Sequence, residues 1–133
     1  MVRTVSRFLS SCLLAVFVTI AGCNSDEKTV YEQELTPEEK ERLAVCLTEN
    51  GWVTYGTSTC SGCRAQRKVF GEAFAHIKYV ECDPYETNAE AERCLKCDIR
   101  KTPTWIQEVD GKEVQRLEMF QLLEYLVEAS GCR

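Results

Sequence analysis

The sequence predicts one α/β domain, built as a three-layer sandwich in which a central mixed sheet of about four strands carries helices on both faces. Segments with helical periodicity alternate with short β-branched and aromatic runs, in the order helix, strand, helix, strand, helix, strand, strand, helix. The chain has 133 residues, which is enough for one small domain and too few for two full cores. We place this domain at residues 37–133.

The first half of the domain is expected to contain two helices around one strand. Thr36, Pro37 and Glu39 supply an N-cap, a proline in the first turn and a capping-box glutamate. This helix ends at Asn50–Gly51, and residues 52–56 are predicted to form a buried strand because they are β-branched and aromatic. The second helix has apolar residues at helical spacing, namely Ala65, Val69, Phe70, Ala73 and Phe74.

The second half is expected to add three strands and two helices. Residues 77–82 alternate as a strand, and residues 88–97 follow as a helix. Two further strands, 104–109 and 112–117, are separated by Asp110–Gly111, which is typical of a two-residue hairpin turn. The inward-facing candidates are Ala89, Ala91, Cys94 and Leu95 in the first of these helices, and Phe120, Leu123, Leu126 and Val127 in the last.

Charge and cysteine content narrow the function. The 16 Lys and Arg residues against 21 Asp and Glu residues give a formal charge of -5, which opposes the phosphate-binding surface of a nucleic-acid partner. The chain contains 9 cysteines, several times ordinary usage. Such a content indicates thiol chemistry, disulfides or a metal, and it indicates export if disulfides are involved.

The N-terminus has the pattern of a targeting segment. Basic residues precede an apolar run at residues 8–20 that is too short to span a bilayer comfortably. Ala21–Gly22 and Cys23 then resemble the lipobox of bacterial lipoproteins, in which the cysteine is acylated and becomes the first residue. We expect residues 1–22 to be a signal peptide, and residues 23–36 to be the lipidated cysteine and a flexible tether.

On this prediction a lipid anchor holds the domain at a membrane of the cell envelope, facing the periplasm or another extracytoplasmic space. Several acyl chains on one cysteine would hold it firmly, because each buried methylene contributes about 0.8 kcal/mol. The alternative is an uncleaved anchor helix with an incidental cysteine. It places the domain on the same side of the membrane.

The first Cys-x-x-Cys pair is expected at a helix N-terminus directly after a strand. A helix N-terminus and nearby cations lower the pKa of a thiol, and only the thiolate attacks a disulfide. Cys60 is therefore the predicted nucleophile, with Arg64, Arg67 and Lys68 as nearby positive charges. Cys63 lies one turn further along, where it can attack the mixed disulfide at Cys60 and release the product.

Thr102 and Pro103 are the second predicted part of this site. We expect the bond between them to be cis, which costs only about 0.5 to 1 kcal/mol before proline. The bend would bring Thr102 beside Cys60. The backbone of Thr102 could then pair with an extended substrate chain and present its disulfide to the nucleophile.

The remaining cysteines of the domain are expected to be mainly structural. Cys82 ends a strand and Cys94 lies in the next helix, so we favour a disulfide between them that closes a short loop and contributes about 2 to 4 kcal/mol. Cys46, Cys97 and Cys132 form an odd set. Each can be free, paired within the set, or an alternative partner of Cys94.

A metal site is the main alternative use of these thiols. The two Cys-x-x-Cys pairs, Cys60 and Cys63 with Cys94 and Cys97, could supply four thiolates to zinc. Their separation is longer than the usual spacing of about 15 to 20 residues, and exported proteins tend to oxidise such thiols. We expect no metal and no cofactor. A metal-binding or metal-delivery lipoprotein is the alternative function, and a non-catalytic binding domain is a third.

Together the residues resemble the thioredoxin-like domain that is often fused to bacterial homologues of vitamin K epoxide reductase. The resemblance runs from about residue 43 to residue 127. It is carried by Tyr55–Gly56, Cys60, Cys63, Gln66, Phe70–Gly71, Ala73–Phe74, residues 79–84, Asn88–Ala89, Cys94 and residues 102–105.

The resemblance implies a thiol-disulfide oxidoreductase that exchanges disulfides with secreted proteins and is reoxidised by a membrane partner that passes electrons to quinone. It also implies the bond between Cys82 and Cys94. We expect this chain to depart from the family, with a lipid anchor in place of the fused membrane domain, and we therefore expect the redox partner to be a separate chain. Thr59 and Ser61–Gly62 stand where the family commonly has an aromatic residue and Pro-His. A strong oxidant is therefore not implied, and we expect a monomer that acts on protein thiols and disulfides.

Overall fold

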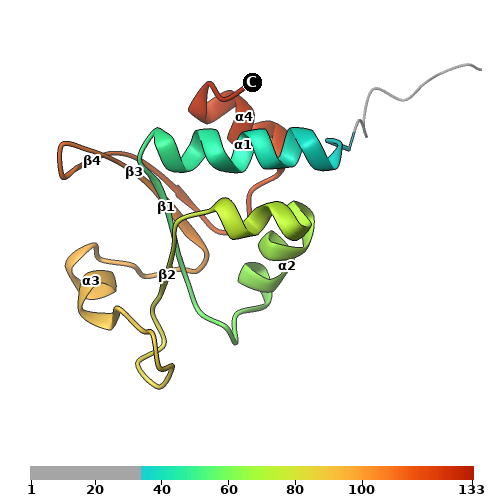
Figure 1. Ribbon diagram of the computed structural model, residues 1–133. Coiled ribbons are helices and arrows are strands. Elements are labelled where there is room, and N and C mark those ends of the chain that lie inside the picture. Colours follow the sequence, from blue (N-terminus) through green and yellow to red (C-terminus); the bar gives the residue numbers. More distant parts are fainter. Residues whose placement is uncertain (1–33) are drawn as a thin grey trace, which may run out of the picture. The chain divides into compact units, whose positions relative to one another are not determined.

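The computed structural model describes residues 34–133 (Figure 1). The predicted signal peptide, Cys23 and most of the predicted tether lie outside the described residues. Within them, no helix is both long and apolar enough to cross a membrane. The elements are α1 (Pro37–Glu49), β1 (Trp52–Gly56), α2 (Ser61–Phe70), the 3-10 helix η1 (Gly71–His76), β2 (Tyr79–Glu81), α3 (Ala91–Lys96), β3 (Thr104–Val109), β4 (Lys112–Glu118) and α4 (Leu123–Ser130).

The four strands form one mixed sheet in the order β2-β1-β3-β4, which confirms the predicted sheet. β1 pairs in parallel with β2 and antiparallel with β3, and β3 continues into β4 as a hairpin. The hairpin turn consists of Asp110 and Gly111, whose φ angles are 52° and 72°. Two positive φ angles are what a two-residue turn requires to match the twist of its strands.

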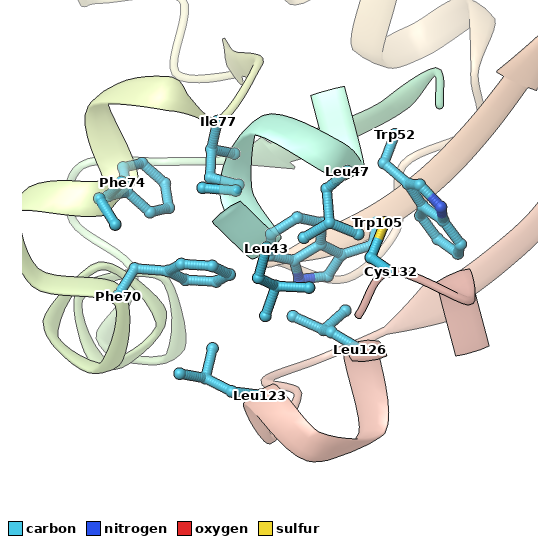
Figure 2. Packing of buried hydrophobic residues seen from close by; sticks show 12 residues of the cluster. Leu43, Leu47, Trp52, Phe70, Phe74, Ile77, Trp105, Leu123, Leu126 and Cys132 are labelled. Atoms are coloured by element: carbon cyan, nitrogen blue, oxygen red, sulfur yellow. The ribbon is translucent and has the colours of Figure 1, made fainter. Parts of the chain in front are cut away.

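Alternate residues of the strands face opposite layers of helices. Trp52 on β1 and Trp105 on β3 belong to a core formed with α1, α2, η1 and α4, which Figure 2 shows from close by. Val53 and Ile106 point to the other face and pack with the α3 segment. The sheet thus carries helices on both faces, so the predicted three-layer thioredoxin-like sandwich is confirmed.

Helix α1 is fixed at both ends. Its N-terminus has the predicted capping box, in which Thr36 Oγ1 accepts from the Glu39 N–H and Glu39 Oε2 accepts from the Thr36 N–H. Near its other end, Cys46 forms a disulfide with Cys132, which follows α4. This bond answers a question that the sequence left open, and it leaves Cys97 as a free thiol.

Two details of the predicted helices are wrong. Helix α3 begins at Ala91 instead of residue 88, because residues 83–89 form two consecutive turns closed by backbone hydrogen bonds. Leu95, a predicted inward residue, is 80% exposed. It follows the buried Cys94 by one residue, and one residue turns the direction of a helical side chain by about 100°.

The face of α2 also differs from the prediction. Ala65 is exposed, and the buried side chain at this level is Gln66, which is 1% exposed. Its amide Nε2 donates to the Gln121 carbonyl (3.0 Å), and its Oε1 accepts from the Gln121 N–H (2.8 Å). This reciprocal pair joins α2 to the segment before α4, so a polar residue is satisfied inside the core.

Candidate active site at the Cys60 and Cys63 pair

Cys60 and Cys63 lie where the chain leaves the sheet and enters a helix. β1 ends at Gly56, a short turn follows, and Cys60 is the N-cap of α2. Its sulfur accepts a hydrogen bond from the Cys63 N–H at 3.3 Å. Cys60 is partly exposed and Cys63 is buried, and both are free thiols. One sulfur is therefore open to a substrate, and the other lies behind it.

The structure brings Thr102 and Pro103 to this pair. The bond between them is cis, and the Cys60 thiol donates to the Thr102 carbonyl at 3.3 Å. A Cβ placed on Gly62 would lie 3.1 Å from Pro103 Cδ, so the first turn of α2 packs closely on the proline. The residues proposed for catalysis and for substrate binding are thus adjacent, although they come from distant parts of the chain.

The surroundings drive the two thiols in opposite directions. Burial alone would raise the pKa of the Cys60 thiol, but hydrogen bonding with the side chains of Thr102 and Cys63 and with the backbone N–H groups of Cys63 and Gly62 holds its pKa below the ordinary value. Burial raises the pKa of the Cys63 thiol to about 11, and its hydrogen bond with Cys60 adds to this effect. The arrangement gives one ready nucleophile and one thiol that stays protonated until it is needed.

The nearby cations act differently from the prediction. Arg64 donates to the Thr59 carbonyl at 2.6 Å, and it thereby ties the start of α2 to the preceding turn. The Arg67 guanidinium lies 4.7 Å from the ring centre of Phe74 and 4.2 Å from that of Tyr79. These side chains brace the site, whereas the hydrogen bonds described above account for the lowered pKa of Cys60.

A polar group beneath Cys63 was not predicted from the sequence. A Cβ on Gly56 would lie 2.7 Å from the Cys63 sulfur and 2.9 Å from Tyr79 Oη, so these two atoms approach each other across the glycine. Tyr79 Oη donates to Glu81 Oε2 at 3.4 Å, and Glu81 Oε1 accepts from the Asp83 N–H at 2.9 Å. Glu81 is only 6% exposed.

A signal for this group was present in the sequence. A glutamate two residues after a tyrosine in a short strand shares its face, and that face turns toward the helix carrying Cys63. Among residues 34–133, the Glu81 carboxylate forms no ion pair within 4.0 Å. A buried carboxylate without such a pair is costly, and it is often found where its charge or proton is used.

The second Cys-x-x-Cys does not join the first. Cys94 forms the disulfide with Cys82, the pair that the sequence favoured, and it packs on the α3 face of the sheet. Cys63 lies on α2, which packs on the opposite face of the sheet. Within residues 34–133 no cluster of three or more candidate metal ligands is present. The four-thiolate zinc site considered above is therefore not assembled.

The alkylation rate of Cys60 is expected to reveal its lowered pKa. Because the surroundings lower the pKa of the Cys60 thiol, its thiolate persists to lower pH than that of an exposed, unpaired cysteine, and the midpoint of its reaction with iodoacetamide should lie below that of a free cysteine measured alongside. Thiolate absorbance at 240 nm, followed by titration of the reduced protein, gives an independent reading. The Cys60→Ser variant should lose this transition, and a transition near the ordinary value in the unsubstituted chain would contradict the prediction.

Comparison with known proteins finds sequence similarity to a protein that is named as a redox enzyme. No protein-family model matches it. The chain is similar to the thiol-disulfide oxidoreductase LTO1 of Arabidopsis thaliana, with 30% identity over 95 residues, which make up 67% of this chain and 25% of that protein. This chain thus matches about a quarter of the relative's length.

The chain is also similar to two solved structures of thioredoxins. One is the thioredoxin of Fasciola hepatica, with a TM-score of 0.46, 20% identity, and coverage of 65% of this chain and 88% of that chain. The other is the thioredoxin NaTrxh of Nicotiana alata, with a TM-score of 0.47, 14% identity, and coverage of 75% and 89%.

Proposed function

We propose that the chain is a thiol-disulfide oxidoreductase that exchanges disulfides with protein substrates through Cys60 and Cys63. The observation that carries the proposal is the opposed behaviour of the two thiols, one partly exposed with a lowered pKa and one buried with a pKa of about 11. The similarity to LTO1, whose name states this activity, supports it. The pair itself can carry both electrons of the exchange, so no cofactor is needed.

The exchange proceeds in two balanced steps. The Cys60 thiolate attacks one sulfur of a substrate disulfide, a mixed disulfide forms, and the other substrate sulfur leaves as a thiolate that takes a proton. Cys63 then gives up its proton and attacks the Cys60 sulfur. The Cys60–Cys63 disulfide forms and the second substrate thiol is released, so the substrate gains two electrons that the pair has lost. The reverse sequence oxidises a substrate dithiol.

Thr102 is proposed to orient the substrate. Its carbonyl lies 3.3 Å from the Cys60 sulfur, and its backbone precedes β3, which begins at Thr104. An extended substrate segment that pairs with this backbone would place its sulfur beside Cys60. The close packing of Pro103 on Gly62 keeps this surface next to the nucleophile.

Glu81 and Tyr79 are proposed to receive the proton of Cys63. The carboxylate is joined by a hydrogen bond to Tyr79 Oη, and Tyr79 Oη approaches the Cys63 sulfur across Gly56. The Tyr79 hydroxyl, with a pKa raised to about 12 by burial, can pass a proton on without remaining ionised. Both residues therefore act on the second step, in which a buried thiol must become a thiolate.

Replacing Glu81 by glutamine is expected to slow the release of substrate from Cys60 by on the order of tenfold or more, because the proton acceptor is lost. Glutamine can still accept from the Asp83 N–H, so the turn that Glu81 holds is kept. The measurement is the release rate of a fluorescent peptide from its mixed disulfide with Cys60, between pH 5 and pH 9. The release rate of the variant should depend more steeply on pH than that of the wild type, because without the acceptor the buried Cys63 thiol must lose its proton to solvent.

Glu41→Gln is the control, because it removes a carboxylate on α1 that lies 3.5 Å from His76 and takes no part in the contacts around Cys63. It should leave both the release rate and the shape of its pH profile unchanged. Equal slowing in both variants would assign Glu81 a structural role only.

The location in the cell envelope is also part of the proposal. The lipobox-like residues 20–23 support a lipid anchor at Cys23, and the resemblance to domains fused to vitamin K epoxide reductase homologues supports a separate, quinone-linked membrane partner. Expression of the full chain in a bacterium fed radioactive palmitate should label the wild type. The Cys23→Ser variant should stay unlabelled, and equal labelling of both would contradict the anchor.

The reduction potential of the Cys60–Cys63 pair tests the central proposal. The full chain is equilibrated with glutathione and dithiothreitol buffers, and the oxidised fraction is read from alkylation. A value of about -120 to -180 mV would indicate an oxidase or isomerase, and a value of about -270 mV would indicate a reductase. Absence of a reversible couple at these two cysteines would refute the proposed function.

A further inference from the structure

A second set of sulfurs lies on the α3 face of the sheet, away from the proposed active site. It consists of the Cys82–Cys94 disulfide and the free thiol of Cys97. Cys94 is buried in the apolar cluster of this face, and both Cys82 and Cys97 pack against the same cluster. A disulfide and a thiol are the two reactants of an exchange reaction, and here one chain holds both of them together.

The backbone of α3 keeps Cys97 close to Cys94. α3 has only 6 residues, and Cys97 is its C-cap, with its N–H bonded to the Arg93 carbonyl at 3.0 Å. The Ile99 N–H bonds to the Cys94 carbonyl at 3.0 Å, which folds the chain back over the end of the helix. Helical residues three apart have Cβ atoms about 5 to 6 Å apart, and a disulfide needs about 3.5 to 4.5 Å. A small adjustment of the last turn would close that gap.

We propose that Cys94 and Cys97 form a second thiol–disulfide exchange site, in which Cys97 displaces Cys82 from Cys94. The Cys97 thiolate attacks the Cys94 sulfur, the Cys94–Cys97 bond forms, and the Cys82–Cys94 bond breaks. Cys82 leaves as a thiolate and takes up the proton that Cys97 lost. No electrons enter or leave the chain, so the exchange requires no external oxidant or reductant.

A hydrogen-bond network around Cys97 is expected to slow this exchange. Tyr55 Oη donates to Glu108 Oε1 at 2.6 Å, and Arg93 lies 3.3 Å from both oxygens of that carboxylate. The hydroxyl has a single proton, which is already donated to Glu108, so at 3.5 Å the Cys97 thiol is the donor to Tyr55 Oη. This bond directs the S–H of Cys97 at Tyr55 Oη, so Cys97 must give up the bond before its sulfur can attack the disulfide.

The charged and titratable groups that face Cys97 come from every neighbouring element. They are Tyr55 on β1, Arg93 on α3, Glu108 on β3 and Arg116 on β4, whose Nη2 donates to the Cys97 carbonyl at 2.7 Å. Of these, Glu108 is the group that accepts the hydrogen bond from Tyr55 Oη. Without its charge, Tyr55 Oη is free to donate to a Cys97 thiolate, and the exchange should accelerate.

The exchange would alter a segment that touches the active-site turn. Residues 83–93 are closed into a loop by the Cys82–Cys94 bond, and Ser58 Oγ donates to Glu86 Oε1 in this loop at 2.7 Å. The Cys82 N–H also bonds to the Gly56 carbonyl at 2.8 Å. Moving the disulfide to Cys97 frees the β2 end of this loop beside the proposed active site.

The three sulfurs can be assigned by peptide mapping, because trypsin separates them. Cleavage after Lys78, Arg93, Lys96 and Arg100 places Cys82 in peptide 79–93, Cys94 in peptide 94–96 and Cys97 in peptide 97–100. The experiment uses the full chain with Cys60→Ser and Cys63→Ser, which removes the reactive pair. The oxidised protein is incubated without oxygen or redox reagents at pH 6 and at pH 8.5, acidified, alkylated and mapped.

The expected result is a transfer of peptide 94–96 from peptide 79–93 to peptide 97–100 that is faster at pH 8.5 than at pH 6, because the thiolate is the form that attacks a disulfide. Adding Glu108→Gln should speed the transfer about tenfold. The matched control Glu90→Gln should not, because it removes the other carboxylate beside Arg93 without contacting Tyr55. A Cys82→Ser variant should form the Cys94–Cys97 bond on mild oxidation.

Several results would overturn the proposal. Peptide 94–96 would remain attached to peptide 79–93 at both pH values, or Cys97→Ser would lose the Cys82–Cys94 bond at the same rate. Scrambling of the Cys46–Cys132 bond in parallel would show that unfolding exposes the sulfurs. Failure of the Cys82→Ser variant to form the Cys94–Cys97 bond would show that these two sulfurs cannot approach to bonding distance.

Discussion

The Cys63→Ser variant is expected to accumulate covalent complexes with its substrates through Cys60, whereas the Cys60→Ser variant should show neither complexes nor turnover. The lowered pKa of Cys60 leaves the first attack intact in the Cys63 variant. The second step is lost, because a hydroxyl in place of the buried thiol cannot form a disulfide. Turnover should fall by at least about a thousandfold in both variants, in line with the loss of a catalytic nucleophile.

The measurement combines non-reducing electrophoresis with mass spectrometry of the trapped partner, and insulin reduction gives the turnover rate. Cys97→Ser is the control, because that thiol lies on the opposite face of the sheet and should leave trapping and turnover unchanged. Trapping through Cys63 in the Cys60 variant would reverse the assigned roles. Complexes that survive in a variant lacking both cysteines would exclude this pair as the site.

Removing the Cys46–Cys132 disulfide is expected to cost about 4.5 kcal/mol of the free energy of unfolding. The bond joins residues with a sequence separation of 86, and the stabilisation by a cross-link grows with the length of the loop that it closes. The Cys82–Cys94 bond, with a separation of 12, should contribute about 3 kcal/mol by the same relation. The double alanine variants of each pair are compared by urea unfolding at neutral pH.

The order of the two effects is the informative result. If the Cys82–Cys94 variant lost more stability than the Cys46–Cys132 variant, contacts in the folded state would outweigh the loop effect. The buried position of Cys94 in the apolar cluster on the α3 face, where Cys82 also packs, supplies such contacts. An unchanged slope of the unfolding free energy against urea shows that the comparison concerns stability alone.

The helices and strands of this fold were predictable because their capping and turn residues mark the same boundaries as the spacing of the apolar residues. The capping box at Thr36 and Glu39 marks the start of α1, and Asp110–Gly111 defines the hairpin. Both signals depend on a few neighbouring residues, so they can be identified without knowing the rest of the structure. The position of Cys60 at the start of α2 belongs to the same class, since a strand and a helical pattern flank it.

The features that escaped prediction depend on contacts between distant residues. The partner of Cys46 is Cys132, and nothing near either residue specifies the other. The polarity of Gln66 predicts a surface position on its helix, yet its side-chain amide forms two hydrogen bonds with the backbone of Gln121. The approach of Tyr79 to Cys63 exists only because β2 lies beside β1 at Gly56. Such pairings follow from the order of strands and helices in space.

The missing side chain of Gly56 also determines how this active site could be grafted onto another scaffold. Any larger residue there would push Cys63 away from Tyr79, since both atoms lie within 3 Å of its Cβ position. A graft limited to the cysteines and their helix would therefore transfer the nucleophile and leave the buried thiol without its neighbour. The smallest transferable unit is therefore that helix together with the two parallel strands β1 and β2, with Gly56 on one strand and Tyr79 and Glu81 on the other.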